Sequence, residues 1–315
     1  MRHRNLPFFF LIYTIETSCR AIRQTIKVPA KVNGPDGNTM YEAFYGLREK
    51  PFSILPDPEL IYWGHNHLMA FAMLEFGVRN SAGFTVITGE IGSGKTTLLR
   101  YLLRKLDPRV VVGLISNTPR GGEGLLQWVM MSLRQPYEAT YPVLFERFHQ
   151  FLRNEYNKGR RTVLIVDEAH NLGFEALEEL RMLLNINADK HQFLQIILVG
   201  QPQLKDMLRT PQLLQFAQRV SSDYHLRPLQ VDEVAKYIDY RLVAVGGKTQ
   251  IFSDEACYLI ADASLGIPRT INILCDTALV YGFASNAQRI GSNLVAHVLS
   301  DKREFGVLPL PADAR

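Results

Sequence analysis

The stretch with the clearest chemistry is a glycine-rich loop, GEIGSGKT, which runs from Gly89 to Thr96. Its pattern is G-x-x-x-x-G-K-[ST], the spacing of a phosphate-binding loop. A run of β-forming residues, 84–88, precedes the loop, and a segment with helical apolar spacing follows it. Because strand, loop and helix are the context that this motif requires, the sequence predicts a site for the phosphates of a nucleotide.

Each residue type in the loop has a chemical reason. Gly92 and Gly94 allow backbone conformations that a Cβ would disfavour, so that successive N–H groups can point at phosphate oxygens. Lys95 is the cation expected on the β- and γ-phosphates, Thr96 the expected Mg²⁺ ligand, and Thr97 a residue near the α-phosphate. The predicted nucleotide-binding set in the loop is Gly89, Glu90, Ile91, Gly92, Ser93, Gly94, Lys95, Thr96 and Thr97.

A pair of acids follows a later apolar strand, in the sequence TVLIVDEAHNL. Asp167 and Glu168 are expected at the carboxyl edge of a parallel sheet, where ligands bind. We predict that Asp167 holds Mg²⁺ through water and that Glu168 orients or deprotonates the attacking water. Two acids that only end a strand are the alternative, but the upstream loop favours the catalytic interpretation. Neither Glu90 nor His170 is assigned a catalytic role.

Three further polar residues are candidates for the site. Gln201 follows another apolar strand, so its amide could reach the γ-phosphate or the lytic water; a simple turn glutamine is the alternative. Arg269 opens a helix near the C-terminus and is expected to reach the bound phosphates, with a surface arginine as the alternative. Arg219 ends a helix before the last strand and is a candidate finger for a neighbouring subunit's γ-phosphate. An ordinary ion pair is its alternative role, and Arg209 is a second candidate finger.

Apolar strands alternate with amphipathic helices through the middle of the chain, which predicts a covered, mostly parallel sheet. The predicted strands are 84–88, 110–115, 162–167, 194–200 and 223–226, and the helices are 66–78, 95–106, 122–134, 143–157, 173–184 and 211–219. After Leu229 only helices follow, at 231–246, 253–264, 269–284 and 292–302. Asp232 and Ser253 are expected to cap two of them. The sequence thus predicts an α/β core with a small helical domain appended.

Length and composition agree with this division. The chain has 315 residues, 47% hydrophobic and 21% charged, which fits one large or two modest globular domains. We predict an extension with little structure over 1–39, the core over 40–228, a helical lid over 229–302 and a tail over 303–315. The extension could also be an ordered packing segment or a membrane-directing segment, because its basic start and short apolar run resemble a weak signal peptide. No segment reaches the length of a transmembrane helix.

Charge and cysteines bear on the class of function, although they leave a local basic patch possible. The net charge of +4 comes entirely from residues 1–39, because residues 40–315 hold 29 basic and 29 acidic residues out of totals of 35 and 31. Charge therefore gives no general attraction to nucleic acid. Cys19, Cys257 and Cys275 show neither a C-x-x-C pair nor zinc spacing, which favours a reducing cytoplasm.

Several motifs in order resemble the AAA+ ATPases of the ExeA/GspA type, which are associated with secretion or exosortase gene clusters and related to TnsC-like transposition ATPases. The quoted motifs are YEAFYGLREKPFSILPDPE, GEIGSGKTT, LIVDEAHNL, LEELRMLLNIN, LVGQPQL, FAQRV and GIPRTINILCDTAL. The resemblance implies an ASCE-type sheet of strand order 5-1-4-3-2, a helical lid, ATP and Mg²⁺ in the cleft between them, and assembly into rings or filaments. It also implies an opening segment near the adenine, where Pro51 and Phe52 could line the pocket; a plain core contact is the alternative.

Two functional classes follow from this resemblance. The first is a cytoplasmic ATPase that acts as an oligomeric motor or switch in assembling a bacterial secretion or polysaccharide-export system, either free or peripheral to the inner membrane. The second is a DNA-associated ATPase that helps a transposase choose its target. The balanced charge of residues 40–315 favours the first. The long secretion members continue into a transmembrane helix and a peptidoglycan-binding region, which we do not expect here, and DEAH stands where the family more often has DEAQ.

Overall fold

The computed structural model describes residues 40–80, 83–116, 124–187 and 192–311. The predicted extension 1–39, the start of the predicted helix 122–134 and the last residues of the predicted tail lie outside the described residues, as does Cys19. Five strands form one sheet: β1 (Phe84–Gly89), β2 (Val110–Ile115), β3 (Arg161–Val166), β4 (Leu194–Gly200) and β5 (Val220–Leu226). All neighbours pair in parallel, in the order β2-β3-β4-β1-β5. This order confirms the predicted one, which counts from the opposite edge.

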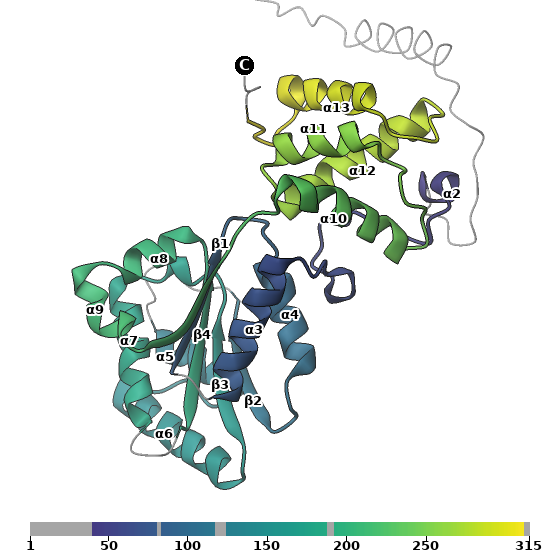
Figure 1. The fold of residues 1–315 in the computed structure, drawn as a ribbon. Coiled ribbons are helices and arrows are strands. Elements are labelled where there is room, and N and C mark those ends of the chain that lie inside the picture. The colour runs from purple at the N-terminus through teal and green to yellow at the C-terminus, as the bar shows by residue number, and fades with distance from the viewer. Residues whose placement is uncertain (1–39, 81–82, 117–123, 188–191, 312–315) are drawn as a thin grey trace, which may run out of the picture.

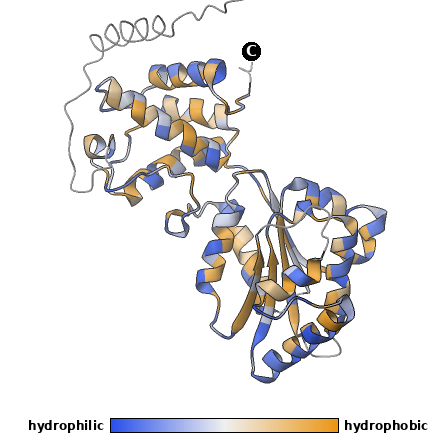
Figure 2. Cartoon of the chain, turned by 180° about the vertical axis from the view of Figure 1, so that it is seen from behind, coloured by the Kyte–Doolittle hydropathy of each residue, from blue (hydrophilic) through white to orange (hydrophobic). Residues whose placement is uncertain are grey.

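Helices cover both faces of the sheet, as Figure 1 shows. The central strands β1 and β4 are buried along their whole length, which explains why they are continuous apolar runs. One face packs against α3 (His65–Arg79) and α4 (Lys95–Lys105). The other packs against α5 (Leu125–Ser132), α6 (Tyr141–Asn157), α7 (Phe174–Leu183) and α8 (Pro202–Leu208). In Figure 2 the strands are correspondingly hydrophobic while the outer surfaces of the helices are polar.

A helical bundle stands beyond the carboxyl edge of the sheet (Figure 1). It contains α10 (Val231–Ala244), α11 (Asp254–Ser264), α12 (Pro268–Ala284) and α13 (Ser292–Phe305), which share one hydrophobic cluster. That cluster also holds Tyr41, Phe52 and Leu60, from the segment that opens the described chain with helix α2 (Glu42–Tyr45) and the single turn η1 (Pro58–Leu60). The opening segment therefore packs with the bundle. The division of the chain into a core over 40–228 and a lid over 229–302 stays a prediction.

Local differences from the sequence prediction have simple causes. The predicted helix 211–219 is divided into a single 3-10 turn, η5 (Pro211–Leu213), and a short helix, α9 (Leu214–Ala217), and β5 begins at Val220 instead of residue 223. Helix α8 was not predicted, although Pro202 at its first position suits a helix start.

The two predicted helix caps have different outcomes. Ser253 caps α11 as expected, since its hydroxyl oxygen accepts a hydrogen bond from the Ala256 N–H at 3.2 Å. Asp232 is not the N-cap, because Gln230, two residues before it, takes that position and forms a capping box with Glu233 at the start of α10. None of the helices in the described part of the chain combines the length and the apolar character needed to span a bilayer.

Candidate functional site

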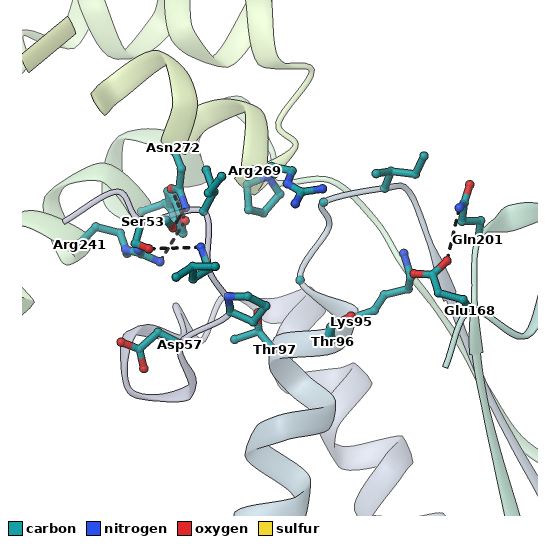
Figure 3. A pocket seen from close by; sticks show the side chains of 18 residues that line it. Ser53, Asp57, Lys95, Thr96, Thr97, Glu168, Gln201, Arg241, Arg269 and Asn272 are labelled. Carbon is teal, nitrogen blue, oxygen red and sulfur yellow. Dashed lines mark hydrogen bonds between the residues drawn. The ribbon is translucent and has the colours of Figure 1, made fainter. Parts of the chain in front are cut away.

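A cleft lies between the carboxyl edge of the sheet and the helical bundle (Figure 3). The phosphate loop and the start of α4 form its floor, and residues of α10 and α12 form the opposite wall. The predicted site residues that line it are Ile91, Gly92, Gly94, Lys95, Thr96, Thr97, Glu168, Gln201 and Arg269. Residues far apart in the sequence thus meet at one place, as expected for the carboxyl ends of parallel strands.

Two glycines of the loop adopt conformations that favour glycine. Gly92 has φ of 81° and Gly94 has φ of 101°, both in the left-handed region. Space is also limiting, because a Cβ on Gly92 would lie 2.5 Å from Cβ of Arg269, and one on Gly94 would lie 2.9 Å from Nε2 of His67. The loop can therefore keep its backbone close to its neighbours only with glycine at both positions.

Lys95 is the first residue of α4 and is only 7% exposed. Its ammonium group donates hydrogen bonds to the carbonyl oxygens of Gly89, at 2.7 Å, and Glu90, at 2.8 Å. Burial lowers the pKa of Lys95, and the negative charges of Glu168, Asp167 and Glu90 oppose that shift. The amine is thus a preorganised cation at the mouth of a loop whose shape suits phosphate.

Thr96 and Asp167 join the loop to the end of β3. The Thr96 hydroxyl donates a hydrogen bond of 3.2 Å to Oδ2 of Asp167, and Oδ1 accepts the Glu168 N–H at 2.9 Å. Burial raises the pKa of Asp167, although both hydrogen bonds and Lys95 lower it. The described residues contain no group of three or more His, Cys, Asp or Glu side chains suited to a metal. One hydroxyl beside one carboxylate fits Mg²⁺, which keeps several waters and takes further oxygens from substrate phosphates.

Glu168 follows Asp167 and turns its side chain into the cleft (Figure 3). Its backbone is left-handed, with φ of 53°, and its side chain is 41% exposed. Nε2 of Gln201 lies 3.5 Å from Oε2 of Glu168, and Nε2 of His170 lies 3.4 Å from the same oxygen. His170, which was assigned no role from the sequence, therefore contacts a predicted catalytic residue.

Arg269 connects the bundle to the phosphate loop. Its backbone N–H donates a hydrogen bond of 3.2 Å to the carbonyl oxygen of Gly92, and its side chain lines the cleft above the loop (Figure 3). Pro268, at the first position of α12, fixes the start of this helix beside the loop. A movement of α12 would therefore displace the phosphate loop directly.

Arg219 lies outside the cleft of its own chain. It immediately precedes β5, at the amino-terminal edge of the sheet, whereas the phosphate loop follows the carboxyl end of β1. Its Nη1 donates a hydrogen bond of 3.1 Å to the carbonyl oxygen of Arg181 at the surface. Arg209, the second candidate, directly follows α8 as its C-cap residue.

The opening segment reaches the cleft with residues that the sequence did not single out. Phe52 is 1% exposed and packs edge-to-face on Phe252 in the bundle, with ring centroids 6.1 Å apart. The core contact, rather than the adenine pocket, is therefore the correct interpretation of Phe52. Residues 53–57 line the cleft instead, and Asn272 of α12 holds Ser53 by a 3.0 Å hydrogen bond to its carbonyl oxygen.

Two buried residues support this arrangement and carry no local sequence signal. His67 of α3 donates a hydrogen bond from Nε2 to the carbonyl oxygen of Ser93 at 3.1 Å, and burial lowers its pKa, so the neutral ring supports the loop. Arg241 of α10 donates from Nε to the carbonyl oxygen of Pro51 at 2.6 Å. Both contacts join segments that are distant in sequence, so only the fold reveals them.

A parallel five-stranded sheet with a phosphate loop after β1, acids after β3 and a helical bundle over the carboxyl edge defines an AAA+ P-loop ATPase domain. The family model described as "AAA domain" matches residues 78–208. The chain is 39% identical to General secretion pathway protein A of Aeromonas hydrophila over 272 residues, which cover 85% of this chain and 50% of that protein. The chain belongs to the ExeA/GspA-type family of AAA+ ATPases, and it spans about half the length of that relative.

Solved structures of origin-recognition proteins share this fold. The ORC2 protein of Aeropyrum pernix in its ADPNP–ADP complexes superposes with a TM-score of 0.60 at 16% identity, covering 82% of this chain and 73% of that one. Drosophila ORC bound to DNA gives a TM-score of 0.58 at 16% identity, covering 93% and 74%. At this level of identity the similarity shows the fold alone.

Proposed function

We propose that this chain binds ATP with Mg²⁺ in the cleft and hydrolyses it. The observation that supports this most is the hydrogen bond between Thr96 and Asp167, which unites the phosphate loop and the acid pair in one oxygen-lined site. Lys95 supplies the cation for the β- and γ-phosphates. Bound Mg²⁺ would neutralise charge on the transferred phosphoryl group.

Glu168 is the proposed general base. Its carboxylate is partly exposed to the cleft, close to Gln201, and can orient an attacking water and accept its proton. Gln201 and Arg269 approach the same space from the sheet and from the bundle. We assign Gln201 to the γ-phosphate or the attacking water, and Arg269 to the phosphates from the lid side.

Each site is proposed to be completed by a neighbouring subunit. Arg219 lies at the sheet edge opposite its own cleft and at the surface, where only another chain could receive it as a finger. Its hydrogen bond to Arg181 holds the side chain at that surface, and an arginine supplied in trans can be worth orders of magnitude in rate. This arrangement requires a ring or filament of chains.

The proposed task is the assembly of a bacterial secretion or polysaccharide-export system, with the chain as motor or switch. Support comes from the 39% identity to General secretion pathway protein A over 272 residues, which cover 85% of this chain. Envelope secretion or export proteins are then the expected partners, at a cytoplasmic location that includes the face of the inner membrane. Only the shared fold supports a role on DNA in transposition. The balanced charge of residues 40–315 argues against that role.

The proposal is tested by phosphate release from ATP by the parent and by Lys95→Ala, with and without Mg²⁺. Magnesium-dependent release that Lys95→Ala abolishes is expected, and equal release by the two proteins would reject the site. A pull-down with Glu168→Gln in ATP then identifies the partner. ATP-dependent binding to plain duplex DNA that falls steeply with salt would favour the transposition role instead.

A further inference from the structure

We propose that His170 is a positioning residue that fixes the side-chain amide of Gln201 and, beside it, the carboxylate of Glu168. This inference rests on the proposed function, because it assigns a role in the same hydrolysis. The three residues come from the carboxyl ends of β3 and β4, which are neighbours in the sheet. His170 follows the acid pair in the turn η3 (Ala169–Asn171), and Gln201 directly follows β4.

His170 contacts Gln201 twice and Glu168 once. The Gln201 backbone N–H donates to Nδ1 of His170 at 3.3 Å, and the side-chain amide nitrogen of Gln201 lies 2.8 Å from Nε2 of His170. Oε2 of Glu168 lies 3.4 Å from the same Nε2. The His170 side chain is only 12% exposed, so its two ring nitrogens depend on these protein partners more than on water. A ring held at both nitrogens cannot turn without losing a partner.

The protons on these groups decide how the amide is oriented. A neutral imidazole has one N–H donor and one lone pair that accepts. Because the Gln201 backbone N–H can only donate, Nδ1 is the acceptor and Nε2 carries the proton. The structure places the amide nitrogen of Gln201, a donor, 2.8 Å from this Nε2–H, so a turn of the amide by 180° is needed to bring its oxygen there as the acceptor. The oxygen and nitrogen of an amide have nearly the same shape, so the hydrogen-bond network determines which one faces the ring.

This orientation leaves the NH₂ group of Gln201 on the side away from the ring. Gln201 lines the cleft, so the NH₂ group is available to a phosphate oxygen or to the attacking water. Meanwhile the proton on Nε2 lies close enough to Glu168 to hold that carboxylate beside Gln201. His170 thereby sets the positions of two groups that are proposed to act on the same water.

The orientation recorded in the structure, with the amide nitrogen of Gln201 toward His170, is the competitor. It gives Gln201 a contact of 3.5 Å from its Nε2 to Oε2 of Glu168, the dashed line in Figure 3, which is long for a hydrogen bond. That orientation sets an NH₂ group against Nε2–H, or else it moves the ring proton to Nδ1, where it opposes the Gln201 N–H. In either case an N–H donor of His170 faces an N–H donor of Gln201. The proposed arrangement avoids this conflict.

The first test compares variants of His170 by phosphate release, with ATP binding measured separately. His170→Ala is expected to lower kcat at least ~10-fold, since small misplacements of catalytic groups are costly, and to leave KM unchanged. His170→Gln can still donate and accept and is expected to restore most of the rate. His170→Phe keeps a ring without nitrogens and is the matched control, expected to be as slow as His170→Ala.

Coupling to Gln201 makes this test specific. If His170 acts largely through Gln201, the loss of rate in the double variant His170→Ala/Gln201→Ala is expected to be clearly smaller than the product of the two single losses. Equal rates for parent and His170→Phe, or losses that simply multiply in the double variant, would overturn the proposal. A parent protein without turnover would instead reject the proposed function.

A second measurement tests the inference without relying on ATPase activity. In protein labelled with ¹⁵N-histidine, the ring nitrogens of His170 are assigned by the loss of their signals in His170→Gln. The proposal requires the Nε2–H tautomer in the parent at neutral to alkaline pH. A proton on Nδ1, or the averaged shifts of a freely exchanging ring, would contradict it.

Discussion

The hydroxyl oxygen of Thr96 lies 3.2 Å from a carboxylate oxygen of Asp167, which is 71 positions further along the chain. Strand β4 lies between the two strands that lead to these residues, so β1 and β3 are not neighbours. The contact therefore depends on parallel strands that bring their carboxyl ends to one edge. It places two oxygen ligands of the kind that Mg²⁺ prefers directly beside the phosphate loop.

Thr96→Val should raise the Mg²⁺ concentration needed for half-maximal turnover by at least ~10-fold, in line with the loss of one oxygen beside a metal. Valine keeps the shape of threonine but has no hydroxyl for Asp167. The measurement is a magnesium titration of phosphate release at saturating ATP. Thr97→Val is the matched control, one residue further on, and should leave the magnesium dependence as in the parent. Superimposable titrations for Thr96→Val and parent would remove Thr96 from the metal site.

Lys95→Ala should abolish nucleotide binding, because the backbone cradle then lacks its buried cation. The side chain is held by the carbonyl oxygens of Gly89 and Glu90, so its removal takes away charge without removing a core contact. Titration with a fluorescent ATP analogue measures the affinity, and an unchanged thermal midpoint shows that the variant is folded. Equal affinity for variant and parent would refute the assignment of the loop.

Local patterns in the sequence predicted the elements of the site well. The phosphate loop and the acid pair each follow a single strand, so one short stretch of sequence contains the signal for strand, turn and polar edge. The strand order was available only through the family resemblance, and the structure confirms it. Periodicity alone cannot order parallel strands, because all of them are equally apolar.

Contacts between distant segments of the chain could not be predicted from the sequence. His67 supports the loop from α3, and Asn272 of α12 holds the opening segment. His170 contacts Gln201 beyond the ends of the neighbouring strands β3 and β4. None of these pairs has a fixed spacing, since the positions depend on how helices pack on the sheet. The predicted helix 211–219 was wrong in its form, because the segment folds as the 3-10 turn η5 and the single-turn helix α9.

His67 should make stability depend on pH. Burial lowers the pKa of His67 below its ordinary 6.5, so the unfolded state binds the proton more readily than the folded state. Its contribution to stability is therefore present above about pH 6.5 and is lost as the pH falls through the folded pKa. His67→Gln can make the same donation to Ser93 without titrating. From about pH 7.5 to about pH 5 the thermal midpoint should fall more in the parent than in the variant; parallel curves would contradict this.

Arg219→Ala should leave ATP binding nearly intact but lower turnover at least ~100-fold, as expected for a finger supplied in trans. Turnover per chain in the parent should rise with protein concentration. Lys95→Ala chains, inactive themselves but carrying Arg219, should restore activity to Arg219→Ala chains. Arg209→Ala is the control for the second candidate. Absence of rescue, together with turnover by a monomer verified by light scattering, would make Arg219 a structural residue.

The most direct test of the whole account measures ATP binding and phosphate release on the same preparation of Glu168→Gln. Glutamine keeps the shape of the side chain but cannot accept a proton from water. We expect parent-like ATP affinity in the presence of Mg²⁺, with phosphate release slowed by ~10²–10⁴-fold, the usual contribution of a general base to the rate. Phosphate release at the parent rate would contradict the assignment of Glu168 and of this cleft as the site of hydrolysis.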